Sequence, residues 1–143
     1  MSVNTAVQTV DIRNLKNHVG DEVTIKGWVS NRRSGKGLEF VVMRDGSGYC
    51  QAVVAADNVK EDQFNAVSKA GLETSIIITG NVVEDERQIG GYEIQVSEAE
   101  IVAYSEEYPI AKKEHGVDFL MDKRHLWLRS KKQHAILKIR HQI

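Results

Sequence analysis

Between residues 23 and 102, short stretches of alternating apolar and polar residues are separated by glycine-rich or polar connections. Alternation with a period of two predicts β-strands that each bury one face. One helix is expected to interrupt the series, because residues 61–70 have a helix-forming composition and are followed by Gly71. The predicted strands are Val23–Ser30, Leu38–Arg44, Tyr49–Val54, Ser75–Val83 and Tyr92–Val96, the last continued by Ile101 and Val102.

This order of elements predicts an all-β fold. Five short strands with one helix between the third and fourth, in about 95 residues, fit the five-stranded Greek-key barrel called the OB-fold. Gly27, inside the first strand, suits the sharp coiling that so small a barrel requires. A five-stranded open sheet with a helix on one face is the alternative.

Charge divides the chain into two parts. Residues 1–111 carry ten Lys or Arg against 17 Asp or Glu, whereas residues 112–143 carry nine against three. The single proline, Pro109, lies at this junction and disfavours helix for the residue before it. We expect a domain edge between Tyr104 and Lys112, with the barrel over residues 1–104 followed by a hinge over 105–129 and a C-terminal helix over 130–143.

Several classes of protein are disfavoured. No run approaches 18 apolar residues, and the first ten residues lack the basic and apolar segments of a secretory signal, so no membrane partner is expected. The one cysteine, Cys50, excludes an intramolecular disulfide and a cysteine-based zinc site, which fits a reducing, cytoplasmic location. The sequence has no GxxxxGK[ST], HExxH or GxSxG motif, so we expect a binding module without catalytic residues or metal ligands.

The connection over residues 31–37 is basic within an acidic region. It carries Arg32, Arg33 and Lys36 together with two glycines. Cations at this place can hold phosphates, and glycines allow the backbone to approach them. The connection adjoins the face of the second and third strands, where OB-folds commonly bind ligands. The alternative is a solvated, flexible loop without a ligand.

Phe40 lies on the predicted strand 38–44, where side chains alternate between two faces. If Val41 and Met43 fill the core, Phe40 points outward and offers a ring on which an unpaired base can stack. The alternative is that Phe40 is itself a core aromatic residue.

Three further side chains can hydrogen-bond to base edges. Gln51 lies on the neighbouring predicted strand, and its amide offers both a donor and an acceptor. Glu93 and Gln95 share one face of the last strand. The alternative for all three is a solvated polar residue on the surface of the barrel.

Residues 27–54 resemble a known family. In order they carry Gly27-Trp28-Val29, Arg32-Arg33, Phe40, Met43-Arg44-Asp45 and Gln51, with eleven residues from Phe40 to Gln51. This segment resembles the anticodon-binding OB-fold of the class II aminoacyl-tRNA synthetases that serve Asp, Asn and Lys.

Residues 108–130, with Trp127 and Ser130, resemble the hinge of the asparagine-specific members of that family. Ser130 is expected to cap a basic helix, which the resemblance identifies as the start of the catalytic domain. The resemblance covers all 143 residues of this chain but about the first third of the enzyme.

The resemblance implies that Phe40 stacks on the middle base of a GUU anticodon, that Gln51 reads this base, and that Arg33 contacts the anticodon strand. It also implies that Arg87 and a residue of the last strand, Glu93 or Gln95, read the first base. The implied partner is tRNA, and the whole ligase is expected to be a homodimer that uses ATP and Mg²⁺.

Two other functions remain open. The chain can be a free-standing OB-fold module that binds single strands or a protein without sequence specificity. It can also be a complete small enzyme, against which the absence of catalytic motifs argues.

Overall fold

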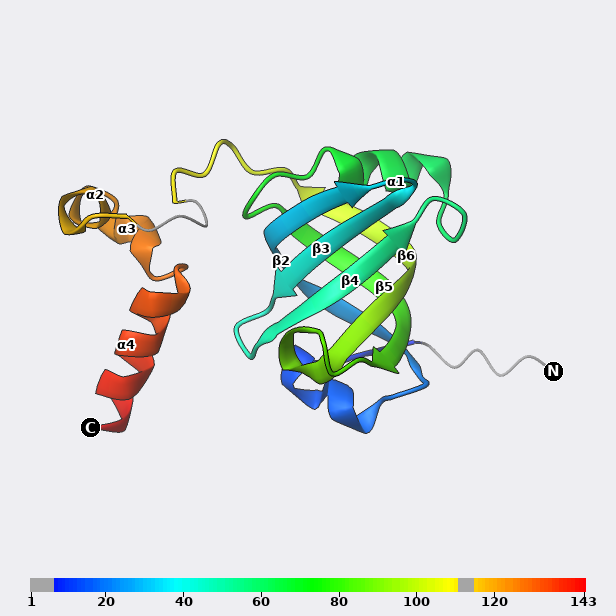
Figure 1. Ribbon diagram of the computed structural model, residues 1–143, viewed down its shortest axis with the longest axis horizontal. Helices are drawn as coiled ribbons and strands as arrows, with labels where there is room; N and C mark the ends of the chain where they lie inside the picture. The colour runs from blue at the N-terminus through cyan, green and yellow to red at the C-terminus, as the bar shows by residue number, and fades with distance from the viewer. Residues whose placement is uncertain (1–6, 111–114) are drawn as a thin grey trace. The chain divides into compact units, whose positions relative to one another are not determined.

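The computed structural model describes residues 7–110 and 115–143. It divides the chain into two compact units, one ending at Glu107 and one beginning at Tyr108 (Figure 1). Part of the expected hinge, residues 111–114, lies outside the described residues. The division into 1–104, 105–129 and 130–143 therefore stays a prediction.

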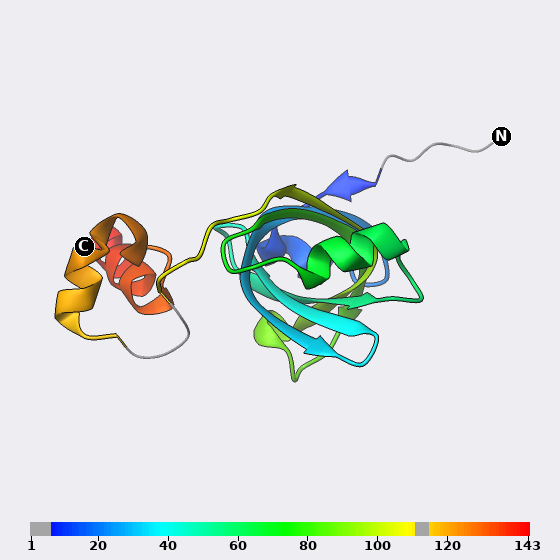
Figure 2. The same cartoon turned by 90° about the horizontal axis from the view of Figure 1, so that it is seen from above.

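The first unit is a closed barrel (Figure 2). Its sheet has the strand order β1-β2-β3-β4-β6-β5, and an additional pairing of β2 with β5 closes it. The pairs β2–β3, β3–β4, β2–β5 and β5–β6 are antiparallel, whereas β4 and β6 run parallel. The OB-fold prediction is confirmed, and the open sheet is excluded. The strands are β1 (Gln8–Thr9), β2 (Glu22–Gly35), β3 (Leu38–Arg44), β4 (Tyr49–Ala55), β5 (Ser75–Glu84) and β6 (Tyr92–Ala103).

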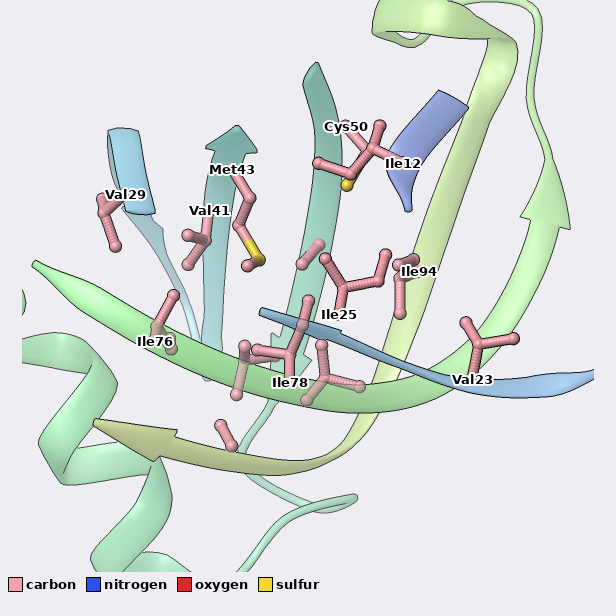
Figure 3. Close-up of a cluster of buried hydrophobic side chains, with 14 of the residues drawn as sticks. Ile12, Val23, Ile25, Val29, Val41, Met43, Cys50, Ile76, Ile78 and Ile94 are labelled. Carbon is pink, nitrogen blue, oxygen red and sulfur yellow. The ribbon is translucent and has the colours of Figure 1, made fainter. Parts of the chain in front are cut away.

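Apolar side chains from every long strand fill the barrel (Figure 3). Val41 and Met43 on β3 are fully buried, and so are Ile25 on β2 and Ile94 on β6. Because side chains alternate along a strand, burial of Val41 and Met43 turns Phe40 to the outer face. The core therefore settles the direction of Phe40, which the sequence left open.

Two glycines lie where strands cross closely. A Cβ atom on Gly27 of β2 would lie 2.3 Å from the carbonyl oxygen of Arg44, and one on Gly80 of β5 would lie 2.2 Å from that of Gln95. No other residue fits at such distances without moving the neighbouring strand. The role expected for Gly27 thus follows from a specific backbone contact.

The predicted connection over residues 31–37 is wrong for most of its length. Strand β2 continues to Gly35 and pairs with β3 up to the pair Gly35–Leu38, after a register shift between Val29 and Asn31. Arg32 and Arg33 therefore lie on a paired strand. Only Lys36 and Gly37 form the turn.

A helix closes one end of the barrel. Helix α1 (Glu61–Ser68) lies across the opening in Figure 2, where Val67 is buried and Phe64 packs against the core. The short 3-10 helices are η1 (Ile12–Asn17) and η2 (Ile89–Gly91). Asp11 is the N-cap residue of η1, but its side chain makes no capping hydrogen bond. Asp45 takes that role, since its Oδ2 accepts a hydrogen bond from the Ile12 amide at 2.8 Å.

The described residues of the second unit form helices. These are α2 (Val117–Asp122), α3 (Arg124–Trp127) and α4 (Lys131–Gln142). Ser130 caps α4 as predicted, because its hydroxyl accepts a hydrogen bond from the Gln133 amide at 3.4 Å. No residue of α4 is buried. None of the described helices is long and apolar enough to cross a membrane.

Candidate nucleic-acid interface

Strand register gathers most of the predicted site residues on the outer face of β2, β3, β4 and β6. Arg33 pairs with Phe40, Phe40 pairs with Val53, and Val53 pairs with Gln95, which makes one row across four strands. A second row runs from Val42 through Gln51 to Glu93. Because neighbouring strands lie about 4.8 Å apart, each row spans the width of a few bases. We call this surface the outer face.

Phe40 is the aromatic centre of the outer face. Its ring is half-buried, and the guanidinium carbon of Arg33 lies 4.7 Å from the ring centroid. A Cβ atom on Gly35 would approach Cε2 of Phe40 to 3.2 Å, so glycine leaves room for the ring. The arrangement is a cation–π pair at the surface, typically worth about 0.5–1 kcal/mol.

Gln51 and Glu93 are in contact within the second row. Nε2 of Gln51 donates to Oε2 of Glu93 at 3.5 Å, which directs the amide nitrogen towards the carboxylate. Partial burial, followed by the nearby Asp85 charge, raises the pKa of Glu93 above its ordinary value. The hydrogen bond from Gln51 and the charge of Arg87 act in the opposite direction.

Arg87 lies in the connection between β5 and η2, beside the outer face. Its Nε and Nη2 donate to the two carboxylate oxygens of Asp85 at 3.0 and 3.1 Å. These hydrogen bonds lower the pKa of Asp85. Strand β5 ends at Glu84 and pairs there with Tyr92, next to Glu93, so the loop that carries Arg87 begins beside the second row.

Arg32 is not on the outer face. Its side chain lies on the inner side of the β2–β3 hairpin, where Nη1 donates to Oε2 of Glu39 at 2.9 Å and Nε donates to the carbonyl of Ala70 at 2.8 Å. Lys36 is exposed in the turn. The structure thus separates the three cations that the sequence grouped together.

Sequence reasoning missed Glu39 as a partner of Arg32. This carboxylate is only 4% exposed and occupies the same face of β3 as Val41 and Met43. Glu39 could have been found, because it occupies a position of the strand where the alternating pattern expects an apolar residue. A carboxylate buried at such a position needs a charged or hydrogen-bonding partner.

Sequence reasoning also missed a cluster at the end of β3. Arg44 donates from Nη1 and Nη2 to the two oxygens of Glu73, at 2.7 and 2.5 Å. The same guanidinium carbon lies 5.7 Å from the ring of Trp28, which is 40% exposed. Glu73 comes from the connection between α1 and β5, so no local pattern indicates this pairing.

Among the described residues, no three His, Cys, Asp or Glu side chains lie close enough to hold a metal ion. Burial raises the pKa of the Cys50 thiol to about 12, which leaves it protonated and unreactive.

Known proteins of similar sequence and structure include tRNA ligases. The chain is 50% identical over 134 residues to asparagine–tRNA ligase of Symbiobacterium thermophilum, covering 94% of this chain and 31% of that protein. The structure of asparaginyl-tRNA synthetase from Pyrococcus horikoshii, complexed with asparaginyl-adenylate, matches with a TM-score of 0.85 at 33% identity, over 94% of this chain and 32% of that one. The structure of asparaginyl-tRNA synthetase from Entamoeba histolytica matches with a TM-score of 0.76 at 29% identity, over 95% of this chain and 33% of that one.

The chain therefore spans about a third of the length of these relatives, and the expected resemblance to asparaginyl-tRNA synthetases is confirmed. Residues 23–102, which include every strand of the barrel except β1, match the tRNA anti-codon family, described as an OB-fold nucleic acid binding domain. This match covers more than half of the chain, and the chain belongs to that family of OB-fold nucleic-acid-binding domains.

Proposed function

We propose that the barrel recognises the GUU anticodon of the asparagine tRNA, as the anticodon-binding part of an asparagine–tRNA ligase used in protein synthesis. The observation that carries the proposal is the strand register, which aligns Arg33 with Phe40 and Gln51 with Glu93 on the outer face. The similarity to asparagine–tRNA ligases over 94% of the chain supports the choice of tRNA.

Phe40 supplies a surface for the middle base. Stacking of an unpaired base on an aromatic ring contributes about 1–3 kcal/mol to binding. Arg33 lies over the ring in the free protein, but its side chain is exposed and exposed side chains change rotamer within nanoseconds. A base can therefore displace the guanidinium, which then reaches a phosphate of the same strand.

Gln51 can distinguish uracil from cytosine at the middle position. Uracil offers a ring N–H donor next to a carbonyl acceptor, whereas cytosine presents an acceptor next to an amino donor. The Gln51 amide nitrogen is directed to Glu93, so its carbonyl is left to accept from a ring N–H. Cytosine has an acceptor in place of that ring N–H, so the Gln51 carbonyl would face another acceptor there, which is unfavourable.

The first base, guanine, has two adjacent N–H donors and a carbonyl acceptor. Glu93 can accept from the donors, and Arg87, whose charge acts on Glu93, can donate to the carbonyl. Gln95 lies in the neighbouring row and can contact the same nucleotide. Lys36, exposed in the β2–β3 turn, is assigned a phosphate contact. Arg32 is left out of the RNA contacts because its guanidinium is bound to Glu39.

For the whole ligase we propose ATP and Mg²⁺ as cofactors, a homodimer and a cytoplasmic location. The described residues contain no acidic or histidine cluster suited to a metal ion. We assign no ATP or Mg²⁺ site to the described residues and derive no step of the ligase reaction from them.

The test is a titration of the chain with anticodon stem-loops that carry GUU or GCU. We expect GUU to bind more tightly, and we expect Gln51→Ala to reduce that preference. Gln8→Ala, in the exposed strand β1, serves as the control and should leave the preference unchanged. Equal affinity for both loops would favour the free-standing, non-specific OB-fold module instead. Absolute affinity should be weak, because residues 1–111 carry a net negative charge.

A further inference from the structure

The β2–β3 hairpin contains a buried ion pair on its inner side. The Glu39 carboxylate accepts hydrogen bonds from Nη1 of Arg32 and from the Ser34 hydroxyl, each at 2.9 Å. The Glu39 side chain is 5% exposed and that of Arg32 is 24% exposed. A carboxylate so far from water needs charged and hydrogen-bonding partners, and removal of one partner leaves an uncompensated buried charge.

The same guanidinium fastens the hairpin to a third element. Nε of Arg32 donates to the carbonyl of Ala70, which follows the end of α1. Arg32 thus joins β2, β3 and the segment after α1 through one planar group. Because a guanidinium has five donors in a fixed plane, these contacts also fix its orientation.

In this part of β2 no apolar side chain decides which face of the strand points inward. From Asn31 to Ser34 the strand is polar throughout, and two adjacent arginines occupy its centre. The register also shifts just before this segment, between Val29 and Asn31. A slip of one residue would exchange the inner and outer faces, so that Arg33 would take the place of Arg32. The apolar pattern that fixes register elsewhere in the barrel is missing here.

We propose that the Arg32–Glu39 pair is a positioning pair, which fixes the register of the hairpin so that Arg33 lies over Phe40. In each strand the pair residue directly precedes a residue of the outer face: Arg32 precedes Arg33, and Glu39 precedes Phe40. This proposal rests on the proposed function, because the effect assigned to Arg32 is an effect on RNA binding. Arg32 does not contact the RNA and acts by placing Arg33.

The test is the double variant Arg32→Gln/Glu39→Gln. It removes both charges together, so net charge is unchanged, and it introduces no apolar side chain that could fix the register in place of the ion pair. We expect affinity for the GUU stem-loop to fall about three- to tenfold, because the site is no longer preorganised. We also expect the Arg33 side-chain protons to lose the NMR ring-current shift that the Phe40 ring produces, since the guanidinium carbon lies 4.7 Å from the ring centroid.

Asp11→Gln/Arg13→Gln is the matched control. It removes an exposed ion pair, also without a change in net charge, at a site remote in sequence from the hairpin. Affinity and the Arg33 shift should both stay as in the original chain. Phe40→Ala is the benchmark for the RNA site itself.

The outcomes separate the two claims. If Phe40→Ala leaves affinity unchanged, the proposed function fails. If Phe40→Ala weakens binding but the double glutamine variant keeps both its affinity and the Arg33 shift, the positioning role is overturned. If the double variant does not fold, Glu39→Gln takes its place in the test, because glutamine keeps the shape of the Glu39 side chain and removes its charge. A lower melting temperature of Glu39→Gln with unchanged affinity and Arg33 shift would show a purely structural pair.

Discussion

Arg33 and Phe40 face each other directly across the β2–β3 hairpin, with the guanidinium carbon 4.7 Å from the centre of the aromatic ring. The pair places a cation that can bind a phosphate beside an aromatic ring on which a base can stack. Both lie on the outer side of strands whose inner side forms the core, so each can be changed without opening a cavity. This separation of binding from stability makes the account testable.

Phe40→Ala should weaken binding of the GUU stem-loop by about 1–3 kcal/mol, the contribution of one stacked base. Stability should change far less, since the ring is only half-buried. Met43→Ala on the same strand is the contrast, because Met43 is fully buried and its truncation should cost about 2–5 kcal/mol of stability. Thermal melting and RNA titration on both variants make the comparison. A Phe40→Ala variant that melts like Met43→Ala but binds normally would refute the assignment.

Arg33→Ala should weaken binding to GUU and GCU loops by the same factor. A phosphate contact carries no sequence information, and its loss should reduce the slope of affinity against salt by about one. Arg13→Ala removes an exposed cation outside the face and controls for the change in net charge. Titrations at several salt concentrations provide the measurement. A change in the preference between the loops would mean that Arg33 contacts a base.

Glu93→Gln should make the barrel more stable at neutral pH. Burial raises the pKa of Glu93 in the folded chain, so folding favours its protonated form. The stability that Glu93 contributes is therefore complete below the pKa of the unfolded chain and is lost as the pH rises through the folded pKa. The glutamine variant avoids this loss.

The measurement for Glu93 is the melting temperature of both proteins between about pH 4 and pH 7. The advantage of Glu93→Gln should be present at the upper end and should shrink towards the lower end. Glu22→Gln, at an exposed position of β2, controls for net charge. An advantage that is constant with pH would contradict the proposed cause.

Gly27→Ala should destabilise the barrel by about 1–3 kcal/mol, the usual cost of overpacking. Its Cβ atom would lie 2.3 Å from the Arg44 carbonyl oxygen, and both strands would have to move. Gly71→Ala is the control, because the nearest atom to its Cβ would lie 4.0 Å away. Denaturant unfolding distinguishes the two variants, and equal stability of both would show that the crossing at Gly27 is not tight.

The sequence predicted the strands well because their alternation is a local property. Alternation placed Val41 and Met43 on one face of β3 and Phe40 on the other, but only the closed barrel shows that Val41 and Met43 are the buried pair. The different roles of Arg32 and Arg33 could not be predicted, because they depend on a register shift that leaves no mark in the residues around it. A shift of this kind changes which side chains face outward without any change in composition.

Contacts between segments that are distant in the chain also could not be predicted from the sequence. Asp45 caps the helix at Ile12, and Glu73 holds Arg44, although 33 and 29 residues separate these partners. Both contacts appear only once the barrel has closed. In contrast, the cap of α4 by Ser130 was predicted, because a cap and its helix are adjacent in the chain.

The central claim is that the outer face of β2, β3, β4 and β6 binds the anticodon loop, and a map of that contact tests it most directly. The amide and side-chain NMR signals of the chain can be followed while a GUU stem-loop is added. We predict chemical-shift changes concentrated at Arg33, Phe40, Gln51 and Glu93. The side-chain amide of Gln51 should change most, because its carbonyl gains a hydrogen bond from the middle base beside the existing contact with Glu93. Shifts confined to α1 and the outer side of β5, with the outer-face signals unchanged, would contradict the account.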